Sequence, residues 1–217
     1  MVTSNRSKNL RDLTRTRKRI LDAAAREFAE HGLPGARVDN IARRARANKA
    51  MIYYIFGGKA ELHLAVLEDL FEEKTRSLDD RLNLEQVTQA DFFLMLKNYY
   101  ETFVERREYA RILLHDIATG GKTLSRLRKK RPDLFEIFGK ISDVVRTAVR
   151  KGVIREIDAD KGVILLILII ASLACLLPHM DLARPPGSAA HQDLADPRQW
   201  QLFLAEILER IIQTRPG

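Results

Sequence analysis

Side chains that bind phosphates and base edges lie close together in the first third of the chain. Lys49 and Lys59 carry positive charge ten residues apart, and Tyr53 and Tyr54 carry phenolic hydroxyls between them. Lysine pairs with phosphate oxygens or with the acceptor atoms of guanine, and tyrosine hydroxyls donate to phosphates. The chemistry expected of this stretch is therefore noncovalent binding of a partner that carries phosphates.

Two short helices are predicted to position these side chains. Helical spacing of apolar residues over 38–45 predicts a first helix with one apolar face. Asn48 can cap a second helix, because its side-chain oxygen accepts from the free amides of the next turn. That second helix is predicted to run from Lys49 to about Phe56, where Gly57 ends it. Two short helices joined by a tight turn form a helix-turn-helix, whose second helix enters the major groove by its N-terminal residues.

A longer helix is predicted to precede this pair. Its apolar stripe indicates that it runs from about Thr14 to Glu30. Gly32 follows and can take the left-handed conformation that ends a helix.

The stretch with the two short helices resembles the DNA-binding domain of the TetR/AcrR family of bacterial regulators. The resemblance covers about residues 20–62 without a gap, and it is carried by Ile41-Ala42, the turn Ala45-Arg46-Ala47-Asn48, and Ala50, Ile52-Tyr53, Phe56, Lys59, Glu61 and Leu62. Arg46 stands where the family prefers glycine, and Ala36-Arg37 stand where a threonine pair usually begins the first of the two helices.

The resemblance implies an all-α fold with an N-terminal three-helix DNA-binding domain and a C-terminal helical domain for ligand binding and dimerisation. We expect a basic, disordered arm over 1–13, the DNA-binding domain over 14–60 and the second domain over 61–217. An alternative for the arm is contact with the DNA backbone or minor groove. The residues expected at the DNA are Arg37, Arg46, Asn48, Lys49, Ala50, Met51, Tyr53, Tyr54 and Lys59.

The net positive charge of the chain comes entirely from its N-terminal end. Residues 1–59 hold fourteen Lys/Arg against five Asp/Glu, whereas residues 60–217 hold twenty-three against twenty-four. This asymmetry is expected if the first end meets phosphates. A second basic run, over 124–131, is predicted to be a solvated loop or short helix, with DNA contact as the alternative.

No enzyme signature is present in the sequence. The five histidines have no metal-ligand spacing, and no nucleophile has a matching base. Cys175 is the single cysteine, so an intramolecular disulfide is impossible and a reducing, cytoplasmic setting is expected. We therefore predict no enzymatic activity, no cofactor and no metal site.

The C-terminal part is predicted to consist of helices over about 59–78, 88–106, 108–119, 132–151, 159–177 and 197–214, with Asp158 capping the fifth. The first of these continues from the DNA-binding domain and is the one mechanical connection between the domains that the sequence shows. Aromatic faces suggest an apolar or aromatic small-molecule effector, with two polar anchors, at Tyr99, Tyr100, Phe103, Arg111, His115, Phe135 and Phe138. Ordinary core packing is the alternative for each aromatic residue.

The run from Gly162 to Leu177 is uncharged and is shorter than the roughly 20 residues of a membrane span. We expect one side of this helix to face its own core and the other a second subunit. The homodimer interface is expected at Leu165, Ile169, Leu173, Trp200, Phe203, Ile207 and Ile211. Taken together, the residues and the resemblance predict a homodimeric repressor that a small molecule releases from a palindromic operator. The alternative is a protein tethered to a membrane by residues 162–177.

Overall fold

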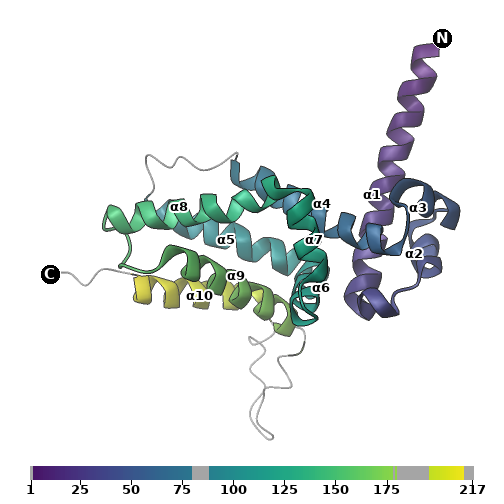
Figure 1. The fold of residues 1–217 in the computed structure, drawn as a ribbon. Helices are drawn as coiled ribbons and strands as arrows, with labels where there is room; N and C mark the ends of the chain where they lie inside the picture. The colour runs from purple at the N-terminus through teal and green to yellow at the C-terminus, as the bar shows by residue number, and fades with distance from the viewer. Residues whose placement is uncertain (1, 80–87, 178, 180–195, 213–217) are drawn as a thin grey trace, which may run out of the picture. The chain divides into compact units, whose positions relative to one another are not determined.

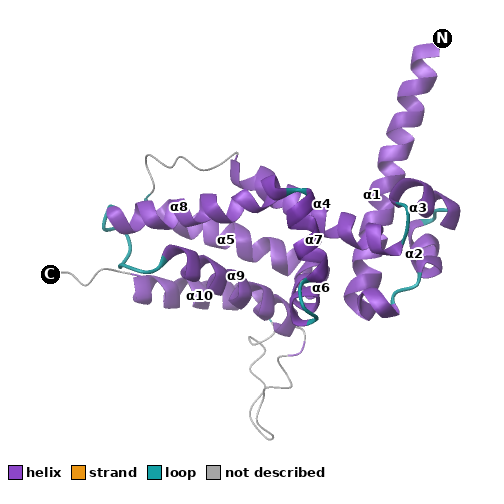
Figure 2. Ribbon diagram, in the orientation of Figure 1, coloured by secondary structure: helices purple, strands orange, loops and turns teal. Residues whose placement is uncertain are grey.

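The computed structural model describes residues 2–79, 88–177, 179 and 196–212, and the regular secondary structure of this part of the chain is all helix, with no strand (Figures 1 and 2). The predicted all-α fold class is confirmed. The helices are α1 (Val2–Gly35), α2 (Val38–Ala45), α3 (Lys49–Phe56), α4 (Lys59–Asp79), α5 (Gln89–Glu105), α6 (Arg107–Ala118), α7 (Lys122–Lys130), the short 3-10 helix η2 (Pro132–Phe135), α8 (Glu136–Arg150), α9 (Ala159–Leu176) and α10 (Pro197–Ile212).

The chain divides into two compact units. Unit 1 comprises Met1–Glu72 and Arg111–Pro132, and unit 2 comprises Glu73–Ala110 and Asp133–Gly217. The chain therefore passes between the units three times: within α4, within α6 and after α7. The expectation of one connecting helix was wrong, because pattern reading along the chain could not show that residues 111–132 fold against the first 72.

Helix α1 is longer than predicted. It begins at Val2 rather than near Thr14, so the segment expected to be a disordered arm has helical backbone from its second residue. No glycine or proline precedes Gly32 in the chain, so nothing in the sequence interrupts the helix before that point. Gly32 produces a kink with φ 63° and ψ 175°. The predicted positive φ at Gly32 is present, but its ψ is extended rather than left-handed helical.

Unit 1 has a core built from the apolar stripes of four helices. Ile20 and Phe28 of α1, Ile41 of α2, Ile52 of α3 and Leu67 of α4 are each almost completely buried. Burying each such side chain contributes about 1.5–3 kcal/mol. Helix α2 packs on α1 and α3 packs on α2, so the two short helices are stabilised by this packing rather than by their own marginal helical stability.

Unit 2 has a separate core formed mainly by α8 and α9. The helices α5 and α8 pack on α9, and α10 packs on α5. The buried cluster comprises Ile137, Ile141, Val144, Val145, Ala148, Ile154, Ala159, Val163 and Ile167. Asp158 caps α9 by accepting a hydrogen bond from the Lys161 amide at 3.0 Å, as predicted.

Candidate nucleic-acid interface

The turn between α2 and α3 has the geometry of a helix-turn-helix. Arg46 ends α2 in the left-handed conformation (φ 49°, ψ 46°), the single non-glycine residue with positive φ in the described part of the chain. Asn48 then caps α3, because its Oδ1 accepts the Ala50 amide at 2.9 Å, which confirms the predicted cap. A glycine at position 46 would remove the backbone strain that an arginine carries there. Arginine adds a cation at the tip of the turn instead.

Helix α3 has one buried side and one bare side. Ile52 is completely buried, whereas Tyr54 is 81% and Tyr53 47% exposed. Lys49 and Ala50, in the first turn, are exposed as well. Large aromatic side chains left uncovered on a short helix are unusual for a soluble monomer and indicate an interaction surface.

The Lys49 ammonium is paired with a carboxylate of the neighbouring helix. Its Nζ lies 2.9 Å from Oδ1 of Asp39, which is on α2. The hydrogen bond and the negative charge of Asp39 raise the pKa of Lys49. Both side chains are largely exposed, so the pair is weakly held. Lys49 can exchange this partner for a base edge or a phosphate at little cost.

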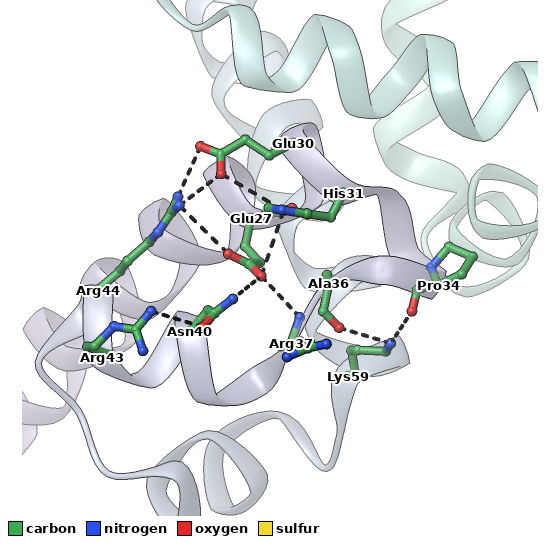
Figure 3. A network of polar contacts seen from close by, with 10 residues as sticks. All are labelled: Glu27, Glu30, His31, Pro34, Ala36, Arg37, Asn40, Arg43, Arg44 and Lys59. Carbon is green, nitrogen blue, oxygen red and sulfur yellow. Dashed lines mark hydrogen bonds and ion pairs between the residues drawn. The ribbon is translucent and has the colours of Figure 1, made fainter.

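Lys59, expected to bind a phosphate, makes contacts within unit 1. Its Nζ donates to the backbone oxygens of Pro34 and Ala36, each at 3.1 Å (Figure 3). An ammonium group has three protons, so one remains for an external acceptor. The first role of Lys59 is thus to hold the end of α1 and the residue that follows it, and phosphate binding stays a prediction for its third proton.

Glu27, which the sequence reading did not single out, lies at the centre of the polar network in Figure 3. It is completely buried on α1, and its Oε1 accepts the Arg37 amide at 3.1 Å and Nδ2 of Asn40 at 2.9 Å. Burial raises the pKa of Glu27. Hydrogen bonds from Asn40 and from the Arg37 amide, with the charges of His31 and Arg44, together lower the pKa by more than burial raises it. The net pKa lies below its usual value. An acidic residue at helical spacing within the apolar stripe of α1 was the available signal.

The same network contains the one group of potential metal ligands found in the described residues. Carboxylate oxygens of Glu27 and Glu30 and a ring nitrogen of His31 lie within 4.8 Å of one another. Arg44, however, donates to both oxygens of Glu30, at 3.1 and 2.8 Å. A guanidinium that binds a carboxylate through two parallel hydrogen bonds is a strong pair, so this cluster is an ion-pair network rather than a cation site.

The second basic run forms α7, and three of its cations are paired with carboxylates of α4. Arg126 pairs with Glu61, Lys130 Nζ lies 3.3 Å from Glu68, and Arg131, just after α7, lies 2.8 Å from Glu68. The short-helix prediction is confirmed. Because these cations are engaged inside unit 1, the alternative of DNA contact finds no support in their geometry.

The residues expected at an effector site divide between the two units. Arg111 and His115 belong to unit 1, whereas the aromatic residues belong to unit 2. Tyr99 and Phe103 form a ring pair with centroids 5.2 Å apart, and Phe135 and Phe138 form another at 6.0 Å.

Their burial supports an apolar environment. Tyr100 and Phe103 are almost completely buried, at 3% and 2% exposed. Burial raises the pKa of Tyr100 to about 12, with Arg107 lowering it and Asp196 raising it, and burial also raises the pKa of Tyr99. These aromatic side chains of α5 therefore lie in or against the apolar interior of unit 2.

An apolar face is left bare on α9 and α10. Leu165 is 59% and Ile169 44% exposed on α9, and Phe203 is 49% exposed on α10. Leu173, Trp200 and Ile207 are partly buried, and the side chain of Ile211 is outside the described set. By length and composition α9 could also cross a membrane, although its inner residues, such as Val163 and Ile170, belong to the unit 2 interior.

Comparison with known proteins places this architecture among bacterial regulators. A family model described as bacterial regulatory proteins, tetR family, matches residues 20–66. The chain is 55% identical over 58 residues to the transcriptional repressor SCO4008 of Streptomyces coelicolor, which is 27% of this chain and 30% of that protein. It is 29% identical over 202 residues to the repressor NicS of Pseudomonas putida, covering 90% of this chain and 92% of NicS. It is 31% identical over 100 residues to the Pseudomonas putida regulator TtgW, covering 46% of this chain and 73% of TtgW.

Solved structures share the fold over nearly the whole chain. The SCO4942 protein of Streptomyces coelicolor superposes with a TM-score of 0.64 at 25% identity, covering 93% of this chain and 99% of that one. FadR from Bacillus subtilis, solved in complex with stearoyl-CoA, superposes with a TM-score of 0.62 at 18% identity, covering 88% and 96%. The second likeness concerns the fold alone.

Proposed function

Because this chain belongs to the tetR family of bacterial regulatory proteins, we propose that it is a homodimeric repressor that binds a palindromic operator and is released by a small molecule. DNA binding through the helix-turn-helix, and the absence of an enzymatic role, follow from the family. The main support for a DNA-binding surface on α3 is that Lys49, Tyr53 and Tyr54 are exposed on one side of the helix. The buried Ile52 anchors its other side.

The leading turn of α3 would contact base edges. Lys49 is suited to the acceptor atoms of guanine and Met51 to a thymine methyl group. Tyr53 and Tyr54 would donate hydrogen bonds to phosphates at the edges of the major groove. Asn48 and Ala50 would lie close to the sugar-phosphate backbone of the DNA. Arg37, Arg46 and the third proton of Lys59 would neutralise further phosphates. Direct contacts to bases supply specificity, and the phosphate contacts fix the register of the helix in the groove.

A second copy of the chain would cover the apolar face of α9 and α10. The exposed leucine, isoleucine and phenylalanine side chains at positions 165, 169 and 203 give a face that is self-complementary in character. Unit 1 of each subunit would then contact one half-site, and the two half-sites would lie in successive major grooves. Cell fractionation tests the membrane alternative: a dimeric repressor stays in the cytoplasmic fraction, whereas a tethered protein pellets until detergent is added.

The effector would be apolar or aromatic. Support for this comes from the aromatic side chains of unit 2: Tyr100 and Phe103 are buried, and Tyr99 and Phe138 pack against its core. Phe135 forms a ring pair with Phe138. The FadR fold accommodates stearoyl-CoA, whose acyl chain is apolar. Arg111 and His115 lie in unit 1, and they remain proposals as polar anchors. Binding in unit 2 would release DNA by changing how unit 1 is held at its three chain connections.

Selection of bound duplexes from a random pool by the purified full chain tests the proposal. A palindrome with two half-sites should emerge, and recovery of no preferred sequence would contradict it. A thermal-shift screen of apolar and aromatic compounds then tests effector control. Compounds that stabilise the protein should also weaken its binding to the selected duplex, and stabilisation without release would argue against induction.

A further inference from the structure

The start of α2 is bound by Glu27, a side chain of α1 that is buried in the protein interior. Glu27 is completely buried, yet it carries a carboxylate. One of its oxygens binds the Arg37 amide, at the N-cap position of α2, and the Asn40 side chain, nearly one turn on (Figure 3). Arg37 itself offers no side-chain cap to α2. Glu27 therefore supplies from α1 the cap that the α2 sequence lacks.

The network continues from Asn40 to a cation on the outer face of α2. Asn40 Oδ1 accepts a hydrogen bond from Nη2 of Arg43 at 3.0 Å. The amide of Asn40 is thus oriented by Glu27 at one end and orients Arg43 at the other. Arg43 is exposed, and no carboxylate contacts it among the described residues.

Arg43 is placed near the leading turn of α3 by its spacing from Asp39 along α2. It is four residues after Asp39, so the two side chains share one column of the helix surface. Asp39 is the residue whose carboxylate contacts Lys49 of α3. A DNA backbone passing the N-terminus of α3 would therefore also pass the guanidinium of Arg43.

We propose that Glu27 is a positioning residue for DNA binding, which fixes the start of α2 and, through Asn40, directs Arg43 to a DNA phosphate. The inference rests on the proposed DNA-binding function and adds to it a buried determinant and a further phosphate contact. An apolar residue at this position would pack at least as well, since a buried charge is seldom the most stabilising choice for an interior site. The carboxylate is explained by what it orients rather than by the stability it gives.

The other oxygen of Glu27 makes the test sharp. Oε2 has no hydrogen-bond partner among the described residues, and Arg44 Nη2 lies 3.9 Å away. Glutamine can keep the accepting oxygen toward Arg37 and Asn40 and place its amide nitrogen at the Oε2 position. Leucine keeps the volume and removes the acceptor. Glu27→Gln and Glu27→Leu therefore separate the hydrogen bonds from the packing.

The experiment measures binding of the full chain to its selected operator duplex over a series of salt concentrations, at a temperature where circular dichroism shows each variant folded. Glu27→Gln should bind within about threefold of the wild type, because the accepting oxygen is kept. Glu27→Leu should bind about tenfold more weakly. The slope of the logarithm of its binding constant against the logarithm of salt concentration, which is the salt dependence, should be smaller in magnitude by about 0.9 for each phosphate that the variant no longer neutralises. Glu30→Gln, an exposed acid of α1 that pairs with Arg44 instead, is the matched control and should leave the salt dependence unchanged.

A cycle with Arg43 identifies the pathway. Adding Arg43→Ala to Glu27→Leu should weaken binding little further, since both changes remove the same contact. If Glu27→Leu proves unfolded, Asn40→Ala interrupts the same relay without touching the interior and should give the same reduced salt dependence. Folded Glu27→Leu or Asn40→Ala binding like the wild type, with unchanged salt dependence, would overturn the positioning role while leaving DNA binding intact. Failure of the wild type to bind any duplex would instead overturn the proposed function itself.

Discussion

The Lys49 ammonium lies 2.9 Å from Oδ1 of Asp39, so the leading cation of α3 is held by a carboxylate of α2. This pair places a negative charge at the surface that we assign to DNA. Asp39 would repel phosphates unless Lys49 and its neighbours lie between the carboxylate and the DNA. This repulsion would weaken the binding of DNA sequences that do not fit the surface.

Replacing Asp39 by alanine should therefore weaken discrimination between sequences. The variant is expected to bind non-operator DNA several-fold more tightly, roughly the effect of one additional net positive charge at the interface. The ratio of operator to non-operator affinity should fall. Competition titrations with labelled operator and unlabelled random duplex measure this ratio at fixed salt, and an unchanged ratio would show that Asp39 does not restrain binding.

An aromatic and an aliphatic position on α3 should separate binding from stability. Tyr54 is 81% exposed, so Tyr54→Ala should leave the melting temperature unchanged. It should weaken operator binding about tenfold through loss of a hydrogen bond to phosphate. Ile52 is completely buried, so Ile52→Ala should instead cost about 2–5 kcal/mol of unfolding free energy. Calorimetry and anisotropy on both variants check this, and a destabilised Tyr54→Ala would contradict the exposed placement.

Acid should destabilise unit 1 through His63. Its ring is buried against Phe28, with centroids 4.7 Å apart, and its Nδ1 has no hydrogen-bond partner among the described residues. Burial lowers the pKa of His63 below its ordinary 6.5, with Asp116 raising it and His115 lowering it. The unfolded chain therefore binds the proton more readily than the folded chain.

The stability that comes from keeping His63 neutral in the folded protein is fully present above pH 6.5. This part of the unfolding free energy is lost as the pH falls from there toward the folded-state pKa of His63. The loss is expected to approach about 1.4 kcal/mol for each pH unit in that window. Unfolding free energies of the wild type and His63→Phe, measured from about pH 5 to about pH 7.5, test this. Equal slopes for the two proteins would show that another group is responsible.

The apolar face of α9 should determine the oligomeric state. Leu165 is 59% exposed and makes little contribution to the core of its own unit. Leu165→Glu should sediment as a monomer at concentrations where the wild type is a dimer, with helical content unchanged, since a charge at an apolar interface is costly. Leu165→Met keeps the apolar character and should remain dimeric. A dimeric Leu165→Glu would place the interface elsewhere.

The helices that the sequence predicted well are those whose ends carry local signals. Asn48 and Gly57 delimit α3, and Asp158 begins α9, so each boundary can be inferred from a few neighbouring residues. The start of α1 was missed because a polar, basic segment without glycine or proline is compatible with either helix or disorder.

The parts that could not be predicted depend on partners distant in sequence. Lys59 was expected to bind phosphate, and the two carbonyls it contacts, at the end of α1 and just after it, lie more than twenty residues earlier in the chain. Glu27 acquires its role from Asn40 and Arg37, and α7 acquires its carboxylates from α4. Composition and periodicity describe one helix at a time and contain no information on such pairings.

The central claim is that α3 presents its leading turn to base edges. The most direct test repeats the selection of bound duplexes with Lys49→Ala beside the wild type. We expect the same palindrome, with base preference lost at one symmetric position in each half-site and retained elsewhere. An unchanged preference at every position would show that Lys49 and the first turn of α3 do not contact the bases.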